Sequence, residues 1–162
     1  MVPFAHDPRF ALLRAPAPEN DFALDVRTGL TAARKWLPPR WFYDALGSSL
    51  FDTICFLPEY YVMRAEAEVL TTHRREIAAA FGPQVRLVEL GSGAARKTRI
   101  LLDELGPVEY VPVDIDEDML QRSARDLLRE YPELRITAIR SDFMRPSVPL
   151  SMLPLALLPP GA

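Results

Sequence analysis

The region from Val85 to Phe143 alternates strand-like and helix-like segments, and this order restricts the fold more than any other feature of the sequence. The apolar run from Val85 to Leu90 leads directly into a Gly-Ser-Gly turn at 91–93. Glycines between a strand and a helix allow the backbone to approach a bound ligand closely. We therefore expect a ligand-binding loop that contains Gly91 and Gly93.

Two further strand-like segments follow this loop. A helix from about Ala94, ended by Gly106 and Pro107, should precede the β-rich run from Val108 to Asp114. A second helix should precede the run from Leu134 to Arg140, and its apolar stripe comprises Leu120, Ala124, Leu127, Leu128 and Tyr131. Strands and helices in this alternation predict an α/β fold with a parallel, Rossmann-like sheet.

The ends of the expected strands carry acidic residues. Asp114 lies 23 positions after Gly91, a spacing that suits a carboxylate on a ribose. A dinucleotide-binding loop favours a third glycine three positions after Gly93, and Arg96 stands there. This substitution disfavours NAD, although an NAD-dependent oxidoreductase stays open as an alternative.

The same residues suit S-adenosylmethionine better. Glu89 can support the loop or the cationic methionine end, and Asp114 can accept hydrogen bonds from the ribose hydroxyls. Asp142 can accept from the adenine amino group, while Phe143 can pack on the adenine ring. Acidic residues at strand ends also occur as turn or helix-cap residues, so each position has a purely structural interpretation as well.

Four runs of the sequence carry a family resemblance. They are LPPRWFYDALGSSLFDTI, LPEYYVMRAEAEVL, LVELGSGAARKTRILLDEL and YVPVDIDEDML. From about Asp25 to Phe143 the chain resembles the ergothioneine-pathway L-histidine Nα-methyltransferases. The resemblance implies a Rossmann-like enzyme that uses S-adenosylmethionine to methylate the α-amine of L-histidine, giving the betaine hercynine.

The resemblance also implies roles for individual side chains. The implied cofactor contacts are Gly91, Lys97, Asp114, Asp142 and Phe143. Tyr43 and Tyr60 are implied on the substrate side, where an aromatic face can attract an amine that becomes a permanent cation. Lys97 could equally be a solvated residue in a first helical turn, and both tyrosines could be packing residues. The resemblance assigns no catalytic nucleophile, and the sequence has no metal-ligand pattern.

The chain divides into four regions in this interpretation. We expect a loose, proline-containing arm over 1–20, a helical substrate-side region over 21–82, and the first half of the cofactor domain over 83–145. The Pro- and Leu-rich tail over 146–162 would lead into a remainder that family members have. We therefore expect a sheet truncated after its third strand, with the run from Val85 to Leu90 as an open edge that could support self-association.

Composition restricts the partners. The 162 residues include 19 basic and 22 acidic side chains, a net charge of −3 without a basic cluster, which disfavours nucleic acid. Prolines interrupt the apolar tail, so it does not predict a membrane span. We expect a cytoplasmic protein with a small-molecule substrate. A methyltransferase for another amine and a non-catalytic cofactor- or partner-binding fragment stay open as alternatives.

Overall fold

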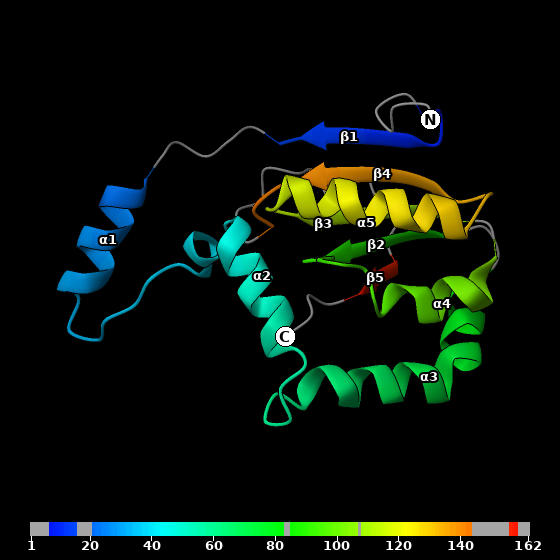
Figure 1. Ribbon diagram of the computed structural model, residues 1–162, viewed down its shortest axis with the longest axis horizontal. Coiled ribbons are helices and arrows are strands. Elements are labelled where there is room, and N and C mark those ends of the chain that lie inside the picture. The colour runs from blue at the N-terminus through cyan, green and yellow to red at the C-terminus, as the bar shows by residue number, and fades with distance from the viewer. Residues whose placement is uncertain (1–6, 16–20, 83–84, 107, 144–155, 159–162) are drawn as a thin grey trace.

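The computed structural model describes residues 7–15, 21–82, 85–106, 108–143 and 156–158 (Figure 1). Within these residues, parallel strands form a single five-stranded sheet in the order β1-β4-β3-β2-β5. The strands are β1 (Phe10–Arg14), β2 (Arg86–Leu90), β3 (Glu109–Asp114), β4 (Arg135–Arg140) and β5 (Ala156–Leu158). The expected α/β fold with a parallel sheet is confirmed.

The middle of the chain folds in the predicted order β2-α4-β3-α5-β4, with α4 at Thr98–Leu105 and α5 at Glu117–Glu130. Helix α4 begins later than Ala94 because Ala95 has a φ of 51°, in the left-handed region that interrupts a right-handed helix. Gly106, at φ 70°, ends α4 as predicted. Asp116 caps α5 by accepting a hydrogen bond from the backbone N–H of Met119 at 3.0 Å.

The main hydrophobic core lies between the sheet and helices α4 and α5. Leu87, Tyr110 and Ile136 contribute side chains from the strands, and each is at most 1% exposed. The predicted stripe on α5 faces them: Leu120, Ala124, Leu127 and Leu128 are buried, and Tyr131 is partly buried. Each fully buried large apolar side chain contributes about 1.5–3 kcal/mol to stability, so this layer fixes the sheet beneath the glycine loop.

The expectation of a loose arm over 1–20 is wrong for Phe10–Arg14, which forms β1 beside β4. Phe10 and Leu12 pack against the main core. Arg14 anchors the end of the strand through an ion pair with Glu117 at 2.7 Å. Partial burial of two apolar side chains and pairing of all five strand residues with β4 therefore order this segment.

The expectation that β2 forms an open edge of the sheet is wrong. Strand β5 follows the third strand in the chain and pairs with β2, aligning Leu87 with Ala156 and Glu89 with Leu158. From Leu87 to Glu89, that side of β2 is therefore paired with another strand of the same chain. The strand order now reverses at β2, with β3 on one side and β5 on the other. The remainder of the tail over 146–162 lies outside the described residues.

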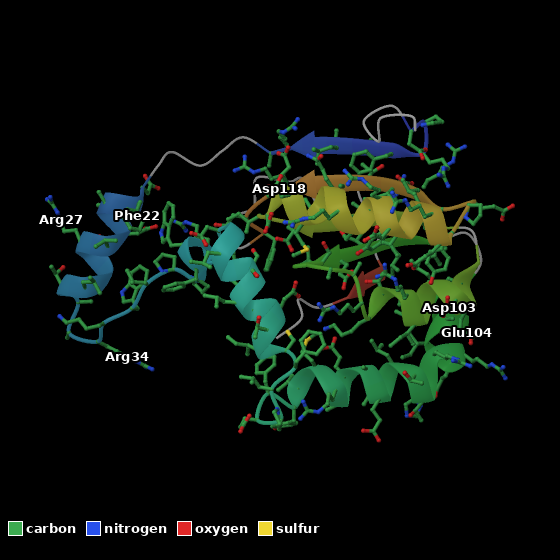
Figure 2. The ribbon with its side chains drawn as sticks, in the orientation of Figure 1. Phe22, Arg27, Arg34, Asp103, Glu104 and Asp118 are labelled. Atoms are coloured by element: carbon green, nitrogen blue, oxygen red, sulfur yellow. The ribbon has the colours of Figure 1, made fainter. Side chains whose placement is uncertain are left out.

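Helices occupy much of the region over 21–82. They are α1 (Phe22–Thr31), the short 3₁₀ helix η2 (Pro39–Phe42), α2 (Ala45–Ile54) and α3 (Val62–Phe81). Helix α2 lies at the carboxyl ends of the strands, and α3 runs beneath α4 in the view of Figure 1. Arg74 of α3 forms an ion pair with Glu104 of α4 at 2.7 Å, at the end of the molecule where Figure 2 labels Glu104. Among the described residues, no helix combines the length and apolar character that a membrane crossing needs.

A partly buried charge cluster connects the helical region to the sheet. Arg40 of η2 pairs with Asp25 of α1, and its guanidinium lies 3.7 Å from Asp142 just after β4. Trp41 donates an indole hydrogen bond to Asp25 at 2.9 Å. The side chains of Arg40, Asp25 and Asp142 are only 12%, 12% and 7% exposed, so this cluster sets where α1 and η2 sit relative to the strand ends.

Candidate functional site

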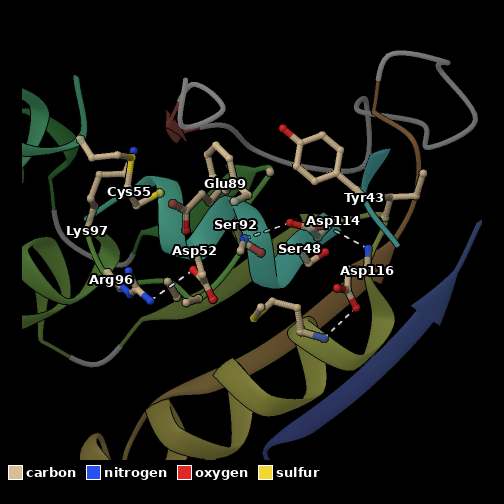
Figure 3. A pocket seen from close by; sticks show the side chains of 18 of the residues that line it. Tyr43, Ser48, Asp52, Cys55, Glu89, Ser92, Arg96, Lys97, Asp114 and Asp116 are labelled. Carbon is tan, nitrogen blue, oxygen red and sulfur yellow. Dashed lines mark hydrogen bonds and ion pairs between the residues drawn. The ribbon is translucent and has the colours of Figure 1, made fainter. Parts of the chain in front are cut away.

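A pocket opens where the sheet order reverses, beyond the carboxyl ends of β2 and β3 and under α2. The pocket is an open cleft, because part of its empty space of about 980 Å³ belongs to the surrounding solvent. Figure 3 shows Asp114 and Asp116 at one end of the pocket, Lys97 and Cys55 at the other, and Glu89 between them. The crevice at such a reversal point is the usual ligand site of an open parallel α/β sheet.

The loop after β2 has the backbone that its glycines predict. Gly91 and Gly93 have φ angles of 66° and 48°, which other residues adopt only with strain. Both glycines line the pocket, and the N–H of Gly91 donates to the carbonyl of Val113 at 2.8 Å. The loop is therefore fastened to the neighbouring strand while it exposes its backbone to the pocket.

Asp114 connects the end of β3 to this loop. Its Oδ2 accepts a hydrogen bond from the N–H of Gly93 at 2.9 Å, and its Oδ1 accepts from the N–H of Asp116 at 3.0 Å. Burial raises the pKa of Asp114, while these backbone hydrogen bonds oppose the rise. A carboxylate has more lone pairs than these two bonds occupy, so Asp114 retains acceptor capacity on the pocket side.

Glu89 forms part of the pocket wall from the end of β2. The residue is 4% exposed, and its Oε2 accepts hydrogen bonds from Thr98 and Tyr110. Burial raises the pKa of Glu89, and the two hydroxyl donors act in the opposite direction. A buried acidic group held by hydroxyls beneath the glycine loop can support the loop and face a cationic group in the pocket.

Lys97 also lines the pocket, immediately before α4. Its side chain is 11% exposed, and its ammonium lies 2.5 Å from a carboxylate oxygen of Glu66 on α3. The solvated alternative for Lys97 is therefore wrong.

The two tyrosines singled out by the resemblance occupy different places. Tyr43 lines the pocket, as does Phe51 of α2, and their rings meet edge to face with centroids 6.0 Å apart. Tyr60 packs against the same Phe51, also at 6.0 Å, but it is not part of the described pocket wall. Burial raises the pKa of Tyr60. The structure thus places Tyr43 in the described pocket wall, and Tyr60 packs against Phe51 of that wall.

Asp142 and Phe143, the predicted pair after β4, also occupy different places. Phe143 lines the pocket and packs against the small apolar cluster formed by Val88, Val111, Val113 and Ile139. Asp142 is not part of the described pocket wall and lies beside Arg40.

Sequence analysis missed several residues of the site. Asp116 lines the pocket, and its Oδ2 is buried without a hydrogen-bond partner among the described residues, which makes it available to a ligand. The sequence contained a signal for it, because Asp116 is the second acidic residue of the Asp-Ile-Asp run that starts at the last residue of β3. Arg96, at the position of the third glycine, pairs with Asp52 of α2 at 3.2 Å and lies over the ring of Phe56. Among the described residues, no cluster of three or more His, Cys, Asp or Glu side chains could hold a metal ion.

These features define the class of protein. A parallel sheet whose order reverses at β2, with a glycine loop and a strand-end carboxylate at that point, has the architecture of Rossmann-like domains, a class that commonly holds nucleotide-containing cofactors at this place. Residues 22–159 match the family described as histidine-specific methyltransferases, dependent on S-adenosylmethionine. The chain belongs to this family, and the resemblance inferred from its sequence is confirmed.

Individual relatives agree with this assignment. The chain is 51% identical over 123 residues to the histidine N-alpha-methyltransferase of Mycolicibacterium smegmatis, a match that covers 74% of this chain and 38% of that protein. It is 34% identical over 124 residues to N-methyltransferase fsqC of Aspergillus fumigatus, covering 74% of this chain and 34% of that protein. It is also 34% identical over 91 residues to ergothioneine biosynthesis protein 1 of Neurospora crassa, covering 54% of this chain and 10% of that protein. The chain therefore spans well under half of the length of these relatives.

Proposed function

We propose that this chain binds S-adenosylmethionine in the pocket between β2, β3 and α2 and contributes to methylation of the α-amine of L-histidine, giving hercynine for ergothioneine synthesis. The observation that carries the proposal is that Asp114, the glycine loop and Tyr43 line one pocket in a member of this family. A cytoplasmic location is part of the proposal. The single cysteine supports it, because the chain cannot form an internal disulfide.

The pocket fits the charged and polar groups of the cofactor. Asp114 and the open oxygen of Asp116 offer acceptors to ribose hydroxyls. Glu89 and Lys97 lie at the other side of the glycine loop, where a zwitterionic amino-acid end meets one group of each charge. Phe143 offers a ring for apolar contact with the adenine. The predicted contact between Asp142 and the adenine amino group stays part of the proposal, and Asp142 lies beside Arg40 at the end of β4.

The acceptor amine binds against the aromatic wall of the pocket, which is formed by the rings of Tyr43 and Phe51. Bound S-adenosylmethionine supplies a methyl group on a sulfonium, and transfer requires a neutral amine held close to it in the correct direction. Tyr43 and Phe51 can hold that amine, exclude water and stabilise the cation that accumulates by about 0.5–2 kcal/mol. Positioning of this kind accelerates such a transfer without a protein nucleophile. Tyr60 contributes to this wall by packing behind Phe51.

The experiment is a methyl-transfer assay of the purified chain with S-adenosylmethionine and L-histidine, read by mass spectrometry of the products. Mono-, di- and trimethylated histidine are expected, and Tyr43→Phe should slow the steps relative to Tyr61→Phe, a change at an exposed neighbouring tyrosine. Cofactor binding without transfer to any amine would favour a non-catalytic cofactor-binding fragment.

A second candidate is methylation of another amine, which the similarity to N-methyltransferase fsqC favours. The same assay with a panel of amino acids and aromatic amines separates the two candidates. Preferred transfer to a different amine would replace histidine as the substrate while leaving the cofactor assignment intact.

A further inference from the structure

Lys97 occupies a place that is electrostatically unfavourable for a lone cation. It immediately precedes α4, where the partial positive charge of the helix N-terminus disfavours an ammonium. Its side chain is nevertheless 11% exposed and lines the pocket instead of extending into solvent. Another group must therefore compensate the charge and hold the side chain in this direction.

Glu66 is that group. Its carboxylate lies 2.5 Å from the Lys97 ammonium and comes from α3, so the contact joins two helices that are adjacent in space but distant in the chain. Glu66 is not part of the described pocket wall. Arg64, two positions earlier, donates to the carbonyl of Leu57 at 2.9 Å and to that of Pro58, which fixes the first turn of α3 and hence the location of Glu66.

Lys97 has acidic neighbours on two sides. The positive charge of Lys97 lowers the pKa of Glu89, and the negative charge of Glu66 raises it, so all three groups act on one another at this end of the pocket. The contact with Glu66 uses part of the hydrogen-bonding capacity of the ammonium, which has further N–H donors for a ligand. A ligand that places a carboxylate at Lys97 and an ammonium near Glu89 would complement both charges.

We propose that Glu66 is a positioning residue, which holds the Lys97 ammonium at the pocket wall so that it receives the α-carboxylate of a bound ligand. The inference rests on the proposed function, because both the methionine end of the cofactor and the acceptor amino acid carry such a carboxylate. Without Glu66, Lys97 turns towards solvent, away from the helix N-terminus, and the carboxylate loses its partner.

The test compares ligands that differ only in this carboxylate. Calorimetric titrations of the 162-residue chain use S-adenosylhomocysteine and its decarboxylated analogue. Glu66→Gln should lower the affinity for S-adenosylhomocysteine about 5- to 10-fold, as expected for loss of a preorganised charged partner. It should change the affinity for the decarboxylated analogue less than about 2-fold. Glu68→Gln, at an exposed position of the same helix, is the matched control and should change neither.

A Lys97 variant tests whether Glu66 acts through this lysine. Lys97→Met should show the same selective loss, and the double variant should bind like Lys97→Met alone, because the two residues act as one unit. A second arm titrates L-histidine and histamine into chain saturated with S-adenosylhomocysteine. If Glu66→Gln weakens histidine selectively and leaves the cofactor pair unchanged, the carboxylate at Lys97 belongs to the acceptor.

Equal weakening of carboxylate and decarboxylated ligands by Glu66→Gln would overturn the proposal, since a merely structural role has that effect. The absence of any carboxylate-dependent effect in both arms would overturn it as well. Failure of the unmodified chain to bind S-adenosylhomocysteine is a different result: it contradicts the proposed function itself, and the positioning role falls with it.

Discussion

Asp114 Oδ2 accepts a hydrogen bond from the backbone N–H of Gly93 at 2.9 Å, which joins the end of β3 to the loop after β2. The same carboxylate lines the pocket, so one side chain shapes the glycine loop and also faces the ligand. Its other oxygen holds the N–H of Asp116, the residue that caps α5. Loop conformation, helix start and ligand site are therefore coupled through Asp114.

Replacement of this carboxylate should destabilise the chain. Asp114→Ala leaves the N–H groups of Gly93 and Asp116 without their acceptor, and we expect a loss of about 1–3 kcal/mol in the free energy of unfolding. Urea denaturation followed by circular dichroism measures this loss. Asp118→Ala, at an exposed position in the first turn of α5, should cost less than about 0.5 kcal/mol. An equal effect of the two substitutions would contradict the coupling.

Glu89 should make stability depend on pH. Burial raises its pKa above the usual 4.5, so the folded chain retains a proton that the unfolded chain releases, and the free energy of unfolding falls as pH rises from 4.5 through the raised pKa. Asp114, whose pKa is also raised, acts in the same direction. Glu89→Gln keeps an oxygen for Thr98 and Tyr110 and removes the titration. Urea midpoints of the variant should therefore vary less with pH above 4.5 than those of the unmodified chain; parallel curves would show that Glu89 does not titrate in this window.

Disruption of the charge cluster of Arg40, Asp25 and Asp142 should lower the free energy of unfolding. Arg40→Met removes the arginine partner of Asp25 and Asp142, two carboxylates that are 12% and 7% exposed. Loss of one partner from a buried ion pair costs about 3–5 kcal/mol, and we expect the lower end because Trp41 still donates to Asp25. Arg34→Met is the control, since Arg34 is exposed and lies far from the sheet in Figure 2. Thermal unfolding of the two variants measures the difference, and similar midpoints would refute the structural importance of the cluster.

Phe51 should support both tyrosines. Its ring meets Tyr43 and Tyr60 edge to face, and Phe51→Leu keeps an apolar side chain while it removes both ring contacts. We expect a loss of about 1–2 kcal/mol in unfolding free energy from the two aromatic pairs. Phe56→Leu changes a ring that is 74% exposed and should cost less. Urea denaturation distinguishes them, and the reverse order of stabilities would show that Phe51 is not the centre of the aromatic wall.

Local patterns predicted the centre of the fold. The glycine loop, the order of strands and helices, and the buried stripe of α5 all follow from periodicity and from the conformational freedom of glycine. Strands β1 and β5 did not follow, since each is short and pairs with a partner far away in the chain. Arg14, for example, pairs with Arg140, near the other end of the described chain. A pattern within a short stretch of sequence cannot indicate a pairing between such distant residues.

The site was predicted in part for the same reason. Motif positions placed Glu89, Gly91, Gly93, Lys97, Asp114, Phe143 and Tyr43 in one region, and all of them line the pocket. Asp142 and Tyr60 were also predicted to contact ligands; they lie beside Arg40 and Phe51 and outside the described pocket wall, so these two contacts stay predictions. Which of two adjacent side chains faces a cavity depends on tertiary packing, and the sequence motif does not encode it.

The central claim is that the pocket at the reversal point of the sheet binds S-adenosylmethionine. Calorimetric titration of the folded 162-residue chain with S-adenosylhomocysteine tests this most directly, with NAD as the competing ligand and Asp118→Asn as the matched control for Asp114→Asn. We predict saturable binding of S-adenosylhomocysteine, strong weakening by Asp114→Asn alone, and no binding of NAD. A folded chain that binds NAD instead, or whose binding of S-adenosylhomocysteine is indifferent to Asp114, would contradict the account.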